Sequence, residues 1–166
     1  MLPRRRVLAL PPALLGLCPA AGQAAEELPR PVLLVSGLIA GAPGGARRFS
    51  LEELEALGLQ ELRTNTPWTA GTQVFSGVPL NRLLQAVGAR GTMLRTVALN
   101  DYAVDIPEED ARLHGAFLAT RLEGRPMRIR DRGPIWLVYP WSEQPALDQI
   151  TYHERSIWQL QRIEVR

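Results

Sequence analysis

The chain contains no lysine, and its 166 residues include only one cysteine and two histidines. The cysteine, Cys18, falls in a leader described below, so the domain that follows it lacks a thiol. This absence excludes a disulfide, a thiolate nucleophile and a soft metal ligand from that domain. His114 and His153 lie in unrelated stretches, and neither has a second histidine or cysteine nearby. The sequence therefore favours structural or surface roles for both histidines over a histidine metal site.

The first 24 residues have the three parts of a secretory signal peptide. Arginines at positions 4–6 are followed by an apolar run over 7–18 and by small residues that end at Ala24. The apolar run is too short to span a bilayer, and Pro11 and Pro12 interrupt it. We predict a signal peptide over 1–24, export to the periplasm by the general secretory or the twin-arginine route, and a domain over 25–166 that does not insert into the membrane.

Removal of the leader changes the charge of the protein. The whole chain has a formal net charge of +2, and loss of three arginines leaves about −1 on residues 25–166 at neutral pH. The remaining arginines are spread along the sequence, so no basic face is expected. Nucleic acid is therefore not expected as a partner.

Short strands and short helices alternate along residues 25–166, which indicates one α+β domain. A capping box at Ser50 to Glu53 predicts one helix start, and Pro79 and Pro107 predict two more. The glycine-rich stretch 41–45 predicts a hairpin loop. The predicted strands are 32–39, 59–66, 93–99, 103–106, 117–122, 135–139 and 157–165, the last with a bulge near Gln161 and Arg162.

The most informative stretch is Asn100-Asp101-Tyr102, which interrupts an apolar run that continues at Ala103. Three adjacent hydrogen-bonding side chains are not needed inside a strand, and each requires a partner if it is buried. They indicate a binding site. The alternative is a simple turn, because asparagine and aspartate tolerate tight backbone conformations.

Polar and aromatic residues gather at the ends of several predicted strands. If these ends converge, they form a cleft with planar walls and polar groups, which suits a flat heterocycle. Trp136 lies inside the most apolar strand and is expected in the core. For Trp68, Trp141 and Trp158, which lie at element ends, a place in the core and a place in the cleft are both open.

Six motifs occur in order between residues 49 and 165. They are Thr66-Pro67-Trp68, Phe75 to Leu80 with Leu83-Leu84, Ala98 to Tyr102, Leu118 to Arg121 with Gly124 and Pro126-Met127, Asp131 to Pro134, and Ser156-Ile157-Trp158. In this combination the chain resembles small periplasmic proteins that share the molybdopterin-binding fold of sulfite oxidases. The resemblance implies a minimal α+β domain of that fold, with a mixed sheet, short helices and a pterin pocket at the strand ends.

The resemblance also shows one departure from the family pattern. The family's enzymes bind molybdenum through the cofactor's dithiolene sulfurs and one protein cysteine, which lies four residues before a tryptophan. The matching residue here is Thr64, whose hard and neutral hydroxyl does not replace a soft thiolate. The prediction is a pterin or a molybdopterin-like ligand without molybdenum, in a non-catalytic protein. Some short relatives are thought to signal to membrane enzymes that make or degrade cyclic di-GMP, which implies the periplasmic domain of such an enzyme as a partner.

Roles for the site residues follow as hypotheses. Asp101 would pair with the amine and ring N–H of a pterin, and Asn100 and Ser156 would bond the remaining ring edge. Tyr102, Trp68 or Trp158 would stack on the ring. Arg121, Arg130 and Arg155 would hold a phosphate or carboxylate tail, and Asp131 is either part of the site or an ion-pair partner of one of them. The full set of predicted ligand-binding residues is Thr66, Trp68, Asn100, Asp101, Tyr102, Arg121, Arg130, Asp131, Arg155, Ser156 and Trp158.

Two other functions stay open. One is a molybdopterin-dependent oxidoreductase, or a subunit of one, in which the metal lacks a protein thiolate. The other is an interaction domain that has lost the pocket.

Overall fold

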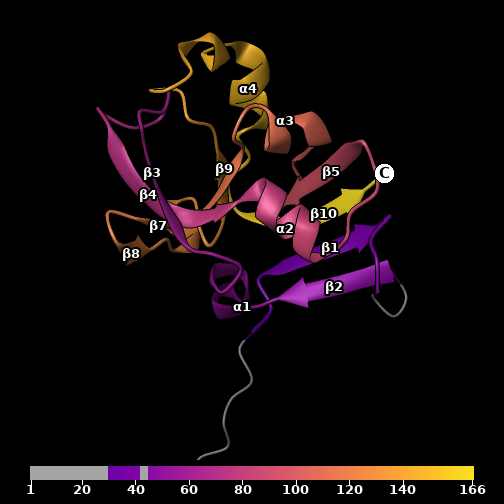
Figure 1. The fold of residues 1–166 in the computed structure, drawn as a ribbon. Coiled ribbons are helices and arrows are strands. Elements are labelled where there is room, and N and C mark those ends of the chain that lie inside the picture. The colour runs from indigo at the N-terminus through magenta and orange to yellow at the C-terminus, as the bar shows by residue number, and fades with distance from the viewer. Residues whose placement is uncertain (1–29, 42–44) are drawn as a thin grey trace, which may run out of the picture.

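A computed structural model describes residues 30–41 and 45–166, which form two sheets with short helices (Figure 1). The predicted leader over 1–24 and most of the glycine-rich loop lie outside the described residues. The first sheet has the order β2-β1-β10-β5-β6. Its strands are β1 (Leu33–Gly37), β2 (Ala46–Phe49), β5 (Met93–Ala98), β6 (Ala103–Pro107) and β10 (Leu160–Val165).

Within the first sheet, β1 pairs in parallel with β10 and the other neighbours are antiparallel. The predicted bulge in the last strand is confirmed, since the register between β10 and β5 shifts between Leu160 and Arg162. The strand itself starts at Leu160, three residues later than predicted. Residues 157–159 instead carry the chain from a helix into the sheet, past the candidate site.

The second sheet is antiparallel and has the order β3-β4-β7-β8, with β9 also paired to β7. Its strands are β3 (Gln60–Thr64), β4 (Gln73–Pro79), β7 (Phe117–Leu122), β8 (Arg125–Pro126) and β9 (Trp136–Val138). Gly77 allows β4 and β7 to approach closely, because a Cβ there would lie 2.0 Å from the carbonyl oxygen of Leu118.

In the part of the chain that the structure describes, four short α-helices connect the strands. They are α1 (Leu51–Glu55), α2 (Leu80–Ala86), α3 (Glu108–Arg112) and α4 (Ile150–Arg155). The predicted capping box of α1 is confirmed, since the Ser50 hydroxyl accepts from the N–H of Glu53 and the Glu53 carboxylate accepts from the N–H of Ser50. The predicted starts after Pro79 and Pro107 are also confirmed.

The helix α4 was not predicted, and Arg155, which precedes the predicted last strand by two residues, is its last residue. In Figure 1, α4 lies above α3 at the top of the molecule, while α2 lies in front of the region where the two sheets meet. Buried side chains from both sheets and from α1 and α2 form one core, which includes Phe75 and Trp136.

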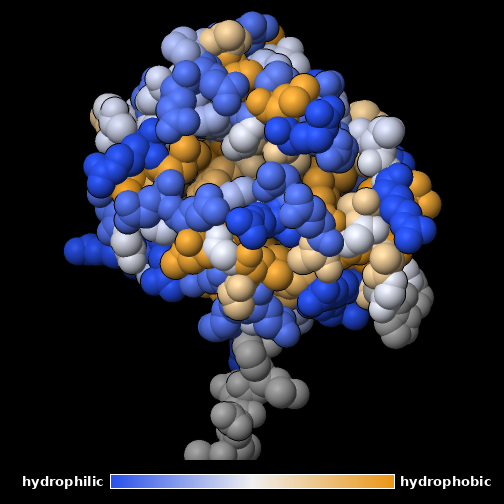
Figure 2. Space-filling view, viewed as in Figure 1, coloured by the Kyte–Doolittle hydropathy of each residue, from blue (hydrophilic) through white to orange (hydrophobic). Residues whose placement is uncertain are grey.

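Figure 2 shows that this face of the molecule mixes hydrophilic and hydrophobic side chains, with orange atoms lying in hollows between blue ridges. Among the described residues, no helix has the length and apolar character needed to cross a membrane.

Candidate functional site

An aromatic pocket of about 490 Å³ lies where four segments of the chain converge. These segments are the loop after β3, the turn between β5 and β6, the helix α4 and the approach to β10. The lining residues are Pro67, Trp68, Ala98, Asn100, Tyr102, Ile150, His153, Glu154, Ser156, Ile157 and Trp158. Five of them, Trp68, Asn100, Tyr102, Ser156 and Trp158, were among the predicted ligand-binding residues. The volume is that of a site for a small organic ligand.

Two half-buried indoles form the aromatic walls of this pocket. The ring centroids of Trp68 and Trp158 lie 5.6 Å apart, with the planes at 69°. Both rings pack edge to face against the buried Trp136, at 5.9 and 6.2 Å. Such edge-to-face pairs are favourable and hold the rings in fixed orientations. The two indoles, in contact and inclined at 69°, therefore form a preformed aromatic corner in which a ligand ring can stack on one face.

The fourth tryptophan belongs to the core. Trp141 is 3% exposed, and its indole N–H donates to the carbonyl of Leu147 at 2.9 Å. Of the three tryptophans whose place the sequence left open, Trp68 and Trp158 line the pocket and Trp141 does not.

Thr66 lies behind Trp68 and fixes the loop that carries it. The Thr66 hydroxyl accepts from the N–H of Trp68 at 3.2 Å and shares a hydrogen bond with the Thr69 hydroxyl at 2.9 Å. Thr66 is buried and outside the pocket lining. The structure therefore gives Thr66 a role in positioning Trp68.

The Asn100-Asp101-Tyr102 segment forms both a turn and part of the site. Asp101 has φ of 63°, and the Asn100 Oδ1 accepts from the N–H of Tyr102 at 3.2 Å. Asn100 and Tyr102 line the pocket, while Asp101 does not. The Tyr102 hydroxyl donates to the carbonyl of Glu154 at 3.0 Å, which joins the turn to α4 across the pocket.

Ser156 is buried in the pocket wall, where its hydroxyl donates to the carbonyl of Leu137 at 2.6 Å. The same oxygen accepts from the indole N–H of Trp136 at 3.2 Å. Because its one hydrogen is used within the protein, Ser156 can face a ligand only as an acceptor. A role at the ring edge is thus restricted to ligand N–H or O–H groups.

The helix α4 contributes two polar side chains that the sequence reasoning did not include. Glu154 is an exposed acidic residue that lines the pocket. His153 packs edge to face against Trp68 at 5.9 Å, and its Nε2 lies 2.8 Å from a carboxylate oxygen of Asp148. His153 is therefore part of the aromatic pocket, in addition to the surface role that its sequence context predicted.

Arg155 points away from the pocket and anchors α4 to α3. Its guanidinium donates to both carboxylate oxygens of Asp110, at 3.2 and 3.1 Å, and Asp110 is only 2% exposed. The Tyr139 hydroxyl donates to the same carboxylate at 2.7 Å. Burial, followed by the charge of Asp110, raises the pKa of the Tyr139 phenol, so the phenol stays protonated and acts as a donor.

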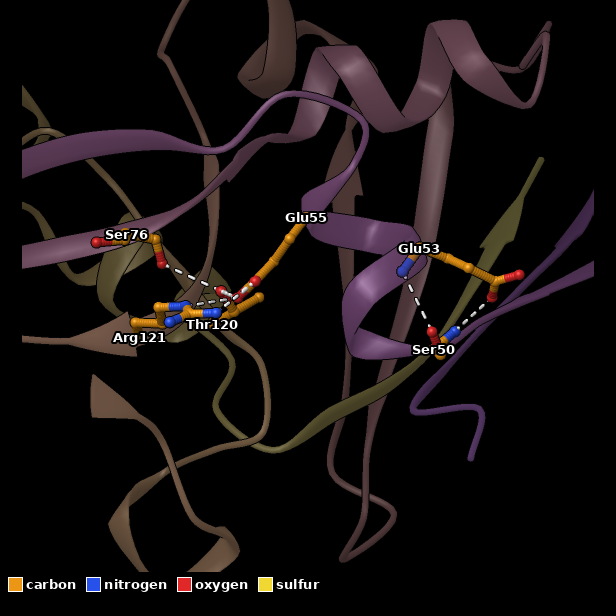
Figure 3. A network of polar contacts seen from close by, with 6 residues as sticks. All are labelled: Ser50, Glu53, Glu55, Ser76, Thr120 and Arg121. Carbon is orange, nitrogen blue, oxygen red and sulfur yellow. Dashed lines mark hydrogen bonds and ion pairs between the residues drawn. The ribbon is translucent and has the colours of Figure 1, made fainter. Parts of the chain in front are cut away.

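Arg121 is engaged in a second internal network, drawn in Figure 3. Its Nε and Nη2 donate to the two carboxylate oxygens of Glu55 at 2.9 and 2.7 Å, and the Thr120 hydroxyl donates to Glu55 at 2.7 Å. The hydrogen bond from Arg121 holds the pKa of the Glu55 carboxyl below its ordinary value. Arg121 lines neither the aromatic pocket nor the second hollow described below, and its contacts tie α1 to β7.

A second hollow, of about 870 Å³, adjoins the aromatic pocket and shares Trp158 with it. Arg130 and Asp131, two of the predicted ligand-binding residues, line it. Asp131 pairs with Arg128 at 2.7 Å and lies 3.9 Å from Arg130. Of the two predicted roles of Asp131, the structure therefore shows the ion-pair partner. We call this second hollow the arginine hollow, with the lining Leu122, Arg125, Pro126, Met127, Arg128, Arg130, Asp131, Arg132, Trp158 and Gln159.

The arginine hollow corrects one expectation from the sequence. Four of its lining residues are arginines from residues 125–132, so the prediction that no basic face exists is wrong. The strand β8 and the 3₁₀ turn at Ile129–Asp131 fold this segment back on itself, which brings the guanidinium groups around one concavity.

Thr64, the residue that the resemblance matches to the family's cysteine, is fully buried at the end of β3. Its hydroxyl donates to the carbonyl of Asn65 at 3.1 Å and accepts from the N–H of Ser142 at 3.0 Å. The Ser142 hydroxyl in turn donates to the Asn65 side chain at 2.7 Å. This hydroxyl therefore joins the loop after β3 to the loop after β9, and it is occupied by protein partners.

The donor chemistry around the pocket suits a pterin ring and does not suit a molybdenum centre. Indole faces, an amide and a carboxylate match a flat ring with N–H and carbonyl edges. A molybdenum centre of this family needs a soft thiolate, and Thr64 supplies a neutral oxygen that is already hydrogen bonded. Within residues 30–41 and 45–166, no three His, Cys, Asp or Glu side chains form a group able to hold a metal ion.

The fold and the pocket define a class of protein, an α+β ligand-binding domain with an aromatic site at the strand ends. Residues 44–147 match the family described as oxidoreductase molybdopterin binding domain, and the chain belongs to this family. A comparison with curated protein sequences found no match.

One solved structure with the same fold is the sulfane dehydrogenase SoxCD from Paracoccus pantotrophus. The TM-score is 0.58 at 17% sequence identity, and the match covers 80% of this chain. It covers 37% of the SoxCD chain, so this protein spans little more than a third of that relative's length. The similarity confirms the predicted molybdopterin-binding fold.

Three of the pocket residues that the sequence reasoning missed belong to α4, and the other three, Pro67, Ala98 and Ile157, lie within two residues of predicted ones. Ile150, His153 and Glu154 follow no strand end and form no motif, so their place in the site depends on how α4 packs. The spacing of His153 and Ile150, three residues apart, is the one signal that places both on the same side of a helix.

Proposed function

We propose that this protein binds a pterin, without a metal, in the aromatic pocket and that it is not an enzyme. The observation that carries the proposal is the combination of two preformed indole walls, Trp68 and Trp158, with a buried threonine where a molybdenum ligand would stand. The family match supports a molybdopterin-type ligand in general, and the donor set supports the ring without the metal.

In this proposal the pterin ring stacks against the aromatic corner that Trp68 and Trp158 form, beside His153. The amide of Asn100 and the carboxylate of Glu154 face its polar edge, because both line the pocket. A carboxylate that receives both the exocyclic amine and a ring N–H makes two charge-assisted hydrogen bonds. Tyr102 closes the site through its bond to the Glu154 carbonyl.

We further propose that the protein is exported to the periplasm and reports ligand occupancy to the periplasmic domain of a membrane enzyme that makes or degrades cyclic di-GMP. The predicted signal peptide supports the location. A role in sensing is consistent with ligand binding alone, because a ligand that is not converted can act by changing a surface.

The proposal is tested on protein purified from the periplasm of the organism that makes it. On denaturation we expect the release of a fluorescent compound whose mass is that of a pterin. The molybdenum concentration should be below one tenth of the protein concentration. Titration with neopterin should quench tryptophan fluorescence, and Trp158→Leu should weaken neopterin binding at least tenfold. Trp141→Phe is the matched control, because Trp141 lies in the core and outside the pocket.

Molybdenum at near-stoichiometric amounts would overturn the proposal. It would favour the alternative of a molybdopterin-dependent oxidoreductase or a subunit of one, which the family match alone leaves open.

A further inference from the structure

We propose that the arginine hollow is a docking surface for an acidic segment of a partner protein. The proposal goes beyond pterin binding, and only the link between ligand and partner rests on the proposed function. Residues 125–132 contain four arginines and one aspartate, a formal charge of +3. The rest of residues 25–166 contains twelve arginines and sixteen carboxylates, so positive charge is concentrated at this one place.

The arginines are presented by a fixed piece of backbone. The N–H groups of Asp131 and Gly133 both donate to the carbonyl of Arg128, at 2.8 and 2.9 Å. The Gln159 side chain donates to the carbonyl of Ile129 at 2.8 Å, which ties the segment to the approach to β10. A preorganised surface loses less conformational entropy when a partner binds.

Three of the four arginine side chains are exposed at the surface. Arg132 is used internally, since it donates to the carbonyl of Trp68 at 3.2 Å and stacks 5.2 Å from the ring centroid of Trp158. The side chains of Arg128 and Arg130 are 66% and 71% exposed, and Arg125 is exposed as well. The planar fork of each guanidinium matches a carboxylate with two hydrogen bonds.

The chemistry of the hollow favours a protein segment over a small anion. Apolar side chains, Leu122 and Met127, share the lining with the arginines, and Ile129 beside them is 59% exposed. Arginine and aromatic side chains around an apolar centre are typical of protein interfaces. The guanidinium of Arg128 already binds a carboxylate here, that of Asp131 at 2.7 Å, and an exposed pair of this kind is weak enough to exchange.

The hollow is also placed to sense the ligand. Trp158 lines both the arginine hollow and the aromatic pocket, and Arg132 stacks on it. A pterin that packs against Trp158 therefore contacts a side chain that a docked segment also contacts. Occupancy of one hollow changes the surface offered in the other.

The test uses the full domain and a set of fluorescein-labelled eight-residue peptides. The number of Asp and Glu rises from two to six across the set, with Leu at the other positions, and a control set has Asn and Gln instead. We expect fluorescence anisotropy at low salt to show binding that tightens with carboxylate number and is absent for the amide peptides. The variant Arg125→Gln/Arg128→Gln/Arg130→Gln should weaken binding at least tenfold. The matched control Arg63→Gln/Arg82→Gln/Arg90→Gln removes the same charge from other exposed positions and should change binding less than twofold.

Four results would overturn the docking proposal. Equal weakening in both triple variants would mean unspecific attraction of charge, and no peptide binding to the unaltered protein would mean no such surface. A third result is that the peptides do not bind, while pyrophosphate or phosphatidylglycerol vesicles bind and Arg125→Gln/Arg128→Gln/Arg130→Gln weakens that binding. This result would assign the hollow to a small anion or a lipid. Self-association lost in that variant, seen by sedimentation velocity, would assign it to a second copy. Neopterin binding is measured on the same samples, so a failure of the pterin proposal is seen separately.

Discussion

At the scale of single residues, most side chains near the site serve to hold other side chains in place. Thr66 fixes the loop of Trp68, Ser156 holds the indole of Trp136, and Thr64 joins two loops. The ligand-facing groups are few. Sequence reasoning located five of them because aromatic and polar residues at strand ends are a local pattern. It assigned Arg121 and Arg155 to the ligand as well, because a sequence does not show which carboxylate a guanidinium will meet.

The carboxylate that recognises the ligand is the first residue-scale prediction. The sequence pointed to Asp101, but Glu154 is the acidic residue among those that line the pocket. We expect Glu154→Gln to weaken neopterin binding about tenfold, because one charge-assisted hydrogen bond contributes roughly 1.4 kcal/mol more than a neutral one. Asp101→Asn is the matched control and should leave the affinity within twofold. Fluorescence titration measures the neopterin affinity of both variants. A larger loss of affinity in Asp101→Asn than in Glu154→Gln would restore Asp101 to the site.

A second residue-scale prediction concerns Glu55 and pH. Its pKa is lowered in the folded state by Arg121, so its contribution to stability is present above the ordinary pKa of 4.5 and is lost as the pH falls through the lower folded value. We expect Glu55→Gln to reduce the free energy of unfolding by about 1 to 3 kcal/mol at pH 7, since charged hydrogen bonds are lost.

The difference between the two proteins should shrink as the pH falls below 4.5. Urea unfolding at several pH values measures this difference. A difference that stayed constant down to pH 3 would show that the Glu55 carboxylate is not what stabilises the fold.

At the scale of elements, the strands were easier to predict than α4. Short runs rich in apolar residues mark β5 and β7, and the bulge in β10 is visible as a break in alternation. The segment Ile150–Arg155 has no such pattern and no side-chain cap at its start. It forms a helix because tertiary contacts hold it, with Tyr152 packed 5.3 Å from Tyr139 and Arg155 paired to Asp110.

This dependence gives a prediction about α4 as a wall of the pocket. Arg155→Met leaves the buried Asp110 carboxylate without its cation, which should reduce the free energy of unfolding by about 3 to 5 kcal/mol. Tyr139→Phe removes one hydrogen bond from the same carboxylate and should cost about 1 to 3 kcal/mol. Denaturant unfolding measures both losses.

Hydrogen exchange tests where these losses occur. In Tyr139→Phe, the milder variant, the amides of residues 150–155 should exchange faster than those of β5 and β10. Uniform acceleration across the domain would mean that Asp110 supports the whole core and not α4 in particular.

At the scale of the whole molecule, the site exists because distant segments meet. The loop after β3, the turn after β5 and α4 are separated by tens of residues, and each carries only part of the pocket. The sequence could predict that polar strand ends occur, and the family resemblance predicted that they converge. Neither could show that residues 125–132 fold back into a second hollow, because that depends on the pairing of β7 with β8 and on the 3₁₀ turn.

Trp158 lines both hollows, and this leads to the last prediction, on the thermal stability of the protein with ligand bound. A ligand that binds only the folded state at 100 times its Kd stabilises it by about 2.7 kcal/mol, and for a domain of this size that raises Tm by about 5 to 10 °C. We expect neopterin to produce this shift in the unaltered protein and in Arg125→Gln/Arg128→Gln/Arg130→Gln, since those side chains lie outside the aromatic pocket. Trp158→Leu should abolish the shift, because its indole is a wall of the pocket. Differential scanning fluorimetry across neopterin concentrations makes the comparison. A full shift in Trp158→Leu would place the ligand elsewhere, and it would remove the link between the two hollows at the same time.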